Sequence, residues 1–150
     1  MANVKLGEFE VTLNGDLPNI GSQLPDFLLA DGDLSNVDLS HFRGKRLVLN
    51  IFPSMNTPVC SAAAVRFNSL ASSHDNTVIL CISRDLAFGH KQFCINHDIN
   101  DVVFLSDMRN ENFANDYGVL HTNGKFQGLL ARSVIATDSD HKIIYTQLVD

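Results

Sequence analysis

The stretch LVLNIFPSMNTPVCSAAAVRFN, residues 47–68, contains a change from strand to helix over a few positions. The run LVLNIF is almost entirely apolar, as expected for a strand that is covered on both faces. Pro53 follows it and has no backbone N–H to donate to a neighbouring strand, so the strand ends there. The alanines after Cys60 favour a helix. A buried strand that leads into a helix is typical of an α/β fold.

The rest of the chain repeats this alternation of apolar strands and helices. Further strands are expected at residues 77–83, 102–107, 133–138 and 142–150, and further helices at residues 86–97 and 110–118. The resulting order, β-α-β-α-β-α-β-β, predicts a mixed sheet with helices on both of its faces. The connection between the last pair of strands is short, which makes that pair antiparallel.

The N-terminal part of the chain carries weaker signals. Residues 8–13 alternate polar and apolar side chains beside the turn residues 14–16, which predicts an N-terminal β-hairpin. A short strand is expected within residues 25–30, and the stretch from there to residue 45 is expected to be a loop. The sequence indicates no linker, repeat or second domain. We therefore expect one domain over residues 1–150, a length that suffices for its own core.

Charge and composition exclude several classes of function. The net charge is -6, and the lysines and arginines are scattered singly, which argues against a nucleic-acid partner. No apolar run approaches the roughly 20 residues that cross a bilayer, so no membrane association is expected. The N-terminus is alternating and carries acidic residues, unlike a signal peptide, which favours the cytoplasm. The three cysteines are an odd number and cannot all pair within one chain.

Cys60 occupies a position at which a thiol can become reactive. Thr57 is a favoured N-cap residue, and Pro58 is well tolerated at the first helical position, so Cys60 becomes the third residue of the helix. There it lies among unpaired backbone N–H groups at the positive end of the helix dipole, which favours the thiolate over the thiol. The opposite interpretation is an inert, buried thiol, because cysteine is among the most frequently buried residue types.

The other cysteines carry weaker signals. Cys81 lies within the apolar run TVILCIS, which predicts a core thiol whose pKa is raised by burial. Cys94 falls late in the second predicted helix, near Lys91 and His97, which would leave it exposed and modestly activated. By itself this position indicates a surface residue.

Other kinds of site fit the sequence less well. A dithiol oxidoreductase needs C-x-x-C, and Ala63 stands where the second cysteine would be. Cys94, His97 and His90 could share one helix face, but no second Cys/His pair completes a tetrahedral metal site, and both histidines are interpreted as solvated. On the residues alone, a binding or chaperone module with an inert Cys60 stays open.

Pro53, Thr57 and Cys60 at a strand-to-helix turn, with Arg132 at the start of a later strand, resemble the peroxiredoxin signature. The longer segments NIFPSMNTPVCSAAAVRFN, TVILCIS, KQFC, GLLARSV and YTQLVD resemble bacterial thiol peroxidases, which are atypical two-cysteine peroxiredoxins. The resemblance extends over nearly the whole chain. It implies a thioredoxin-like α/β fold, with a mixed sheet flanked by helices and an added N-terminal hairpin.

The resemblance also implies a role for each site residue. Cys60 would be the peroxidatic nucleophile that becomes a sulfenic acid, and Cys94 the resolving cysteine that closes an intrachain disulfide with it. The Thr57 hydroxyl would bond the thiolate and the peroxide, Arg132 would stabilise the developing charge, and Pro53 would shield the pocket. The implied activity is reduction of hydrogen peroxide and organic hydroperoxides in antioxidant defence, recycled by thioredoxin. It needs no cofactor and no metal, and the family often forms homodimers.

The sequence departs from the family pattern at Asn56, where an aspartate is common, and at Asp150, after which the family usually continues into a last helix. The first change is expected to have little effect, whereas a missing helix would leave apolar sheet surface uncovered. A disulfide also requires Cα atoms within about 7 Å, and the cysteines lie at opposite ends of successive helices. We therefore expect both helix ends to unwind during the cycle, helped by Gly89 in the second helix.

Overall fold

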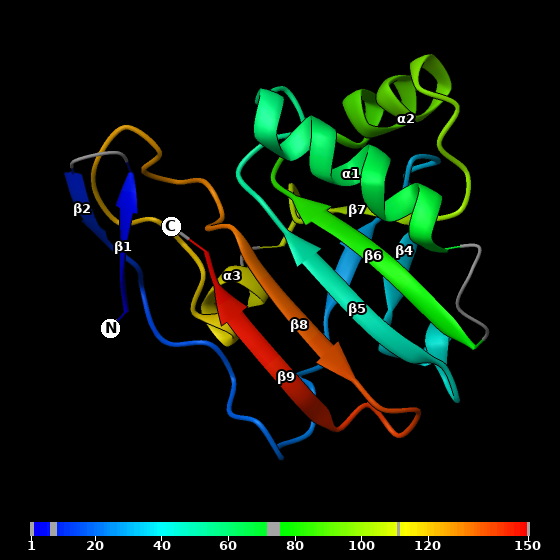
Figure 1. The fold of residues 1–150 in the computed structure, drawn as a ribbon, viewed down its shortest axis with the longest axis horizontal. Helices are drawn as coiled ribbons and strands as arrows, with labels where there is room; N and C mark the ends of the chain where they lie inside the picture. The colour runs from blue at the N-terminus through cyan, green and yellow to red at the C-terminus, as the bar shows by residue number, and fades with distance from the viewer. Residues whose placement is uncertain (1, 7–8, 72–75, 111, 150) are drawn as a thin grey trace.

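The computed structural model describes residues 2–6, 9–71, 76–110 and 112–149 (Figure 1). The strands are β1 (Asn3–Leu6), β2 (Phe9–Thr12), β3 (Leu28–Ala30), β4 (Asn36–Asp38), β5 (Arg46–Ile51), β6 (Thr77–Ser83), β7 (Val103–Ser106), β8 (Ser133–Thr137) and β9 (Ile143–Leu148). The helices are the 3-10 helix η1 (Leu39–Phe42) and the α-helices α1 (Pro58–Ala71), α2 (Ala87–Asn96) and α3 (Asn112–Tyr117).

Most strands belong to one mixed sheet. Among the described residues its order is β4-β3-β7-β6-β5-β8-β9. The central strands β5, β6 and β7 are parallel, and β8 and β9 continue the sheet as antiparallel neighbours (Figure 1). This topology confirms the predicted element order and the antiparallel final pair. It places the carboxyl ends of β5 and β6 side by side, where the segments leading to α1 and α2 begin.

The two faces of the sheet carry different helices. Along β5, Leu47, Leu49 and Ile51 belong to a core that includes residues of α3 and of the N-terminal hairpin. Val48 points to the other face, where the core contains Cys60 of α1 and Phe93 of α2. The alternation follows from the two-residue period of a strand. Helices therefore cover both faces, as predicted, and the two cysteine-bearing helices share one face.

The N-terminal hairpin is confirmed, but its turn lies elsewhere than expected. β1 and β2 pair antiparallel with Leu6 opposite Phe9, and the two residues between these strands lie outside the described part of the chain. Instead of turning back at residues 14–16, the chain pairs with a distant segment, and the Asn14 N–H donates to the Leu120 carbonyl at 2.9 Å. The Asn-Gly-Asp signal is local, and a tertiary pairing overrides it here.

The segment before β5 contains more structure than a loop. β4 pairs antiparallel with β3, and η1 follows it directly. Asp38 caps η1, accepting a hydrogen bond from the Ser40 N–H at 3.0 Å. Strands this short carry almost no periodic signal, which explains the wrong prediction of a loop. No helix among the described residues combines the length and apolar character that a membrane crossing requires.

Candidate active site

The loop between β5 and α1 presents Cys60 at the start of a helix. Pro53 is buried two residues after the end of β5, and α1 begins at Pro58. The Cys60 N–H donates to Thr57 Oγ1 at 3.2 Å, and the Ser61 N–H donates to the Thr57 carbonyl at 2.9 Å. Thr57 is therefore the N-cap, as predicted, and Cys60 is the third residue of α1.

The Thr57 hydroxyl has a second partner that the sequence does not reveal. It donates its one proton to the Ser54 carbonyl at 3.1 Å while it accepts from the Cys60 N–H. In this arrangement the hydroxyl proton points to the backbone rather than to the sulfur. The expected bond from Thr57 to a thiolate or a peroxide therefore requires the hydroxyl to rotate away from Ser54.

Cys60 lies against a small cavity on the face of the sheet that carries α1 and α2. Its side chain is 3% exposed, and the cavity has a volume of about 230 Å³. The lining is mostly apolar and includes Phe52, Phe67 and Val149. Arg132, the residue directly before β8, lines the same cavity. The fold thus brings Cys60 and Arg132 to one pocket from distant segments of the chain.

Asn50 is a polar wall residue of this cavity that the sequence analysis missed. Its side chain is buried, and its Nδ2 donates to Cys81 Sγ at 3.8 Å. The sequence contains one indication of this role, since Asn50 is a single polar residue within the apolar run LVLNIF. A buried amide needs a hydrogen-bond partner, so such a residue marks a polar contact in the core. Its bond to the Cys81 sulfur supplies one.

Cys81 behaves as predicted, and Cys94 does not. Cys81 is fully buried, and this burial raises its pKa to about 12, which confirms an inert core thiol. Burial also raises the pKa of Cys94, which is half-buried and packs against the core that contains Cys60. The expected activation is therefore wrong. Lys91 is instead paired with Asp33 at 2.9 Å, and His97 stacks on the Phe93 ring.

His90 of α2 also differs from the expectation, whereas His97, which follows α2, is exposed as predicted. His90 was interpreted as solvated, but it is 1% exposed, and its Nε2 lies 2.7 Å from Ser83 Oγ. His97 is exposed, and its Nδ1 lies 3.1 Å from the Phe93 carbonyl. Within the part of the chain that the structure describes, no three His, Cys, Asp or Glu side chains are grouped so as to hold a metal ion.

The fold and this site define a class of protein. The Redoxin family model matches residues 19–150, so the chain belongs to the Redoxin family. It is 42% identical over 150 residues to the thiol peroxidase of Corynebacterium glutamicum, with 100% of this chain and 90% of that protein covered. It is 40% identical to the thiol peroxidase of Mycobacterium tuberculosis, with 99% and 89% covered.

The solved structures give the same result. A peroxiredoxin-like protein from Aquifex aeolicus superposes with a TM-score of 0.91 at 32% identity, over 98% of this chain and 85% of that one. The thioredoxin-like peroxiredoxin fold with its N-terminal hairpin is thereby confirmed. Within its family the chain is a thiol-dependent peroxidase of the peroxiredoxin type.

Proposed function

We propose that Cys60 is the nucleophile of this peroxidase and that the cavity beside it receives the hydroperoxide. The observation that carries the proposal is the meeting of Cys60 and Arg132 at one cavity. The Cys60 thiolate attacks the terminal peroxide oxygen, the O–O bond breaks, and the leaving oxygen takes up a proton to become water or an alcohol. The sulfur is oxidised to a sulfenic acid.

The surrounding groups assist this step in different ways. The Arg132 guanidinium stabilises the thiolate and the negative charge that develops on the leaving oxygen. The Thr57 hydroxyl, after rotating from the Ser54 carbonyl, donates to the peroxide. Pro53 is buried beside the loop and shields the sulfur from water. The apolar walls formed by Phe52 and Phe67 suit organic hydroperoxides as well as hydrogen peroxide.

We further propose that Cys94 resolves the sulfenic acid. The Cys94 sulfur attacks the Cys60 sulfenic acid, a disulfide forms, and water leaves. The dithiol of thioredoxin then reduces this disulfide by exchange and is itself oxidised. Because burial raises the pKa of Cys94, the last turn of α2 has to open before that sulfur becomes a good nucleophile. Such a cycle belongs in the cytoplasm, where thioredoxin keeps thiols reduced.

The proposed assembly is a homodimer that packs around the start of α2. Leu86 and Phe88 are 61% and 65% exposed there, so two large apolar side chains close in sequence are available for contact with a second copy. Sedimentation of the wild type and of Phe88→Ser tests this assembly. A wild type that sediments as a monomer at all concentrations would refute it.

The function is tested by peroxide turnover with thioredoxin, thioredoxin reductase and NADPH. Cys60→Ser is expected to abolish turnover, since no other thiol has the same setting. Cys94→Ser should consume about one peroxide per protein and then stop, because the sulfenic acid has no partner. Cys81→Ala is the matched control and should turn over like the wild type. Sustained turnover by Cys60→Ser would show that the nucleophile is assigned wrongly.

A further inference from the structure

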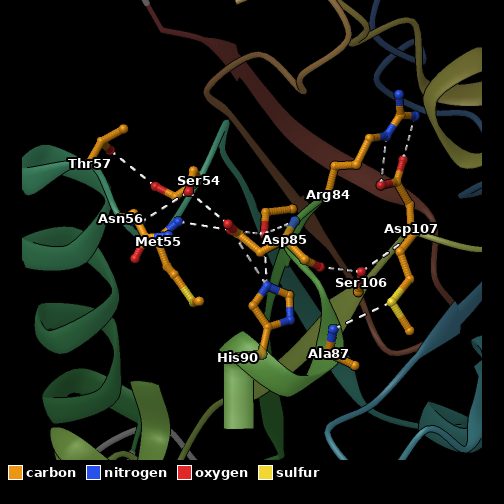
Figure 2. Close-up of polar contacts among 12 residues, drawn as sticks. Ser54, Met55, Asn56, Thr57, Arg84, Asp85, Ala87, His90, Ser106 and Asp107 are labelled. Carbon is orange, nitrogen blue, oxygen red and sulfur yellow. Dashed lines mark hydrogen bonds and ion pairs between the residues drawn. The ribbon is translucent and has the colours of Figure 1, made fainter. Parts of the chain in front are cut away.

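A cluster of polar side chains connects the loop before Cys60 with the end of β6 (Figure 2). At its centre is Asp85, in the turn between β6 and α2. Its Oδ1 accepts from Ser54 Oγ at 2.7 Å, and its Oδ2 accepts from the Met55 N–H at 2.9 Å and from Ser83 Oγ at 2.6 Å. One carboxylate therefore holds two consecutive residues of the loop that leads to Cys60.

The charge of Asp85 determines the direction of these bonds. Burial raises the pKa of this carboxyl, but the nearby His90 ring and the hydrogen bonds from Ser83, Ser54 and Met55 outweigh it and lower the pKa to about 2. The ionised carboxylate can only accept, so Ser83 gives its single proton to Asp85. His90 Nε2, 2.7 Å from Ser83 Oγ, must then donate to that oxygen. The cluster thus reaches a buried residue of α2 that lies one turn before Cys94.

The loop touches α2 at a second point. A Cβ atom added at Gly89 would lie 2.8 Å from Met55 Cε, so the Met55 side chain packs directly on the backbone of this helix. Met55 is thereby held twice, through its N–H by Asp85 and through its side chain by α2. The absence of a side chain at Gly89 therefore makes room for Met55, in addition to the expected weakening of the helix.

The cluster also reaches Cys60 through three hydrogen bonds that are linked by the covalent frame of Ser54. Asp85 accepts from the Ser54 hydroxyl, the Ser54 carbonyl accepts from the Thr57 hydroxyl, and Thr57 Oγ1 accepts from the Cys60 N–H. Asp85 therefore fixes the position of the residue that caps α1. A change at Asp85 would alter the first turn of α1 without touching the sulfur or the peroxide.

We propose that Asp85 is a positioning residue that latches the loop before Cys60 to the start of α2. The latch is the pair of hydrogen bonds that Asp85 accepts from the Ser54 hydroxyl and the Met55 N–H, and it is closed while both are formed. In the closed state Thr57 and Cys60 are placed for reaction with peroxide. For Cys60 and Cys94 to bond, their Cα atoms must come within about 7 Å, so the latch has to open first. The closed latch favours the peroxide step, and the open latch favours disulfide formation. This inference rests on the proposed Cys60–Cys94 cycle.

The test separates the two chemical steps in Asp85→Asn. The peroxide step is measured by competition with a haem peroxidase, and disulfide formation by rapid quenching, alkylation and mass spectrometry. Hydrogen bonds to a charged group are strong enough that losing them should slow the peroxide step by about tenfold and speed disulfide formation by a similar factor. Ser54→Ala keeps the carboxylate and removes one bond, so it should shift both rates in the same directions by less.

The matched control is Asp107→Asn. Asp107 is also a buried carboxylate, at the end of β7, and it binds Arg84 at 2.9 Å. This variant should lower stability without moving the two rates in opposite directions. If both rates in Asp85→Asn were unchanged, or fell together, Asp85 would be only structural and the latch would be refuted. If Asp85→Asn does not fold, the rates of Ser54→Ala decide in the same way.

The outcomes also distinguish this inference from the proposed function. A wild type that reacts with peroxide but forms no Cys60–Cys94 disulfide refutes the proposed cycle and the release of the latch together. A normal disulfide in the wild type, combined with rates in Asp85→Asn that do not move in opposite directions, refutes the latch alone.

Discussion

Replacing Asp85 by asparagine should make the stability of the protein less dependent on acid. Burial by itself raises the pKa of this carboxyl, but its hydrogen bonds lower it from the ordinary 3.8 to about 2. A group whose pKa is lowered in the folded state stabilises the fold above the unfolded value. That stability is lost as the pH falls from about 3.8 towards about 2.

The size of the effect follows from the shift. Each unit of pKa corresponds to about 1.4 kcal/mol, and the side chain is 11% exposed, so a small allowance for solvent leaves about 2 kcal/mol of stability. Asp85→Asn should lose about this amount at neutral pH and match the wild type more closely in acid.

Urea unfolding followed by far-UV circular dichroism measures this difference, since the chain has no tryptophan for fluorescence. The comparison runs from about pH 7 down to about pH 3 in both proteins, with all cysteines reduced. Ser54→Ala should fall between them, because it removes one of the bonds that lower the pKa. A gap between wild type and Asp85→Asn that stays constant across this range would refute the reasoning.

The remaining predictions concern the two helix ends. Thr57→Val removes the acceptor of the Cys60 N–H and should cost about 1 kcal/mol in urea unfolding and slow the peroxide step, whereas Thr57→Ser should preserve both. Gly89→Ala should strengthen α2 by up to about 1 kcal/mol once the Met55 methyl moves aside, and quenched samples should show slower disulfide formation. An unchanged disulfide rate would mean that α2 does not open in that step. Because burial raises the pKa of Cys94 above the ordinary 9.0, the closed helix loses stability as pH rises above that value. Disulfide formation should therefore accelerate there, and a profile that falls with pH would contradict this.

Local sequence patterns were sufficient for the central part of the fold. The strand at residues 77–83 was predicted with the bounds that β6 has in the structure, because a continuous apolar run is a local signal. The N-cap at Thr57 was predicted for a similar reason, since the capping residue and the helix it starts are neighbours in sequence. Both predictions depend on residues a few positions apart.

Predictions that depend on distant partners were wrong or absent. Lys91 was expected to lie near Cys94 and activate it, but Lys91 is instead bound by Asp33, from another part of the chain. His90 was taken to be solvated, although it is buried beside Ser83 of β6 and Phe104 of β7. No local pattern indicated the contacts of Asp85, since its partners Ser54 and Met55 lie on the preceding strand-to-helix loop.

The sequence by itself determined the order of strands and helices, the capped start of α1 and the presence of a thiol in its first turn. These features depend on backbone preferences and side-chain periodicity, which act over a few residues. Only the tertiary structure decided that Arg132 shares a cavity with Cys60 and that Asp85 ties the loop to α2. The physical reason is that each feature depends on strand pairing between distant residues. Antiparallel pairing sets Ser133 of β8 opposite Ile51 of β5, which brings Arg132 to the end of β5, and parallel pairing of β5 and β6 brings their carboxyl ends together.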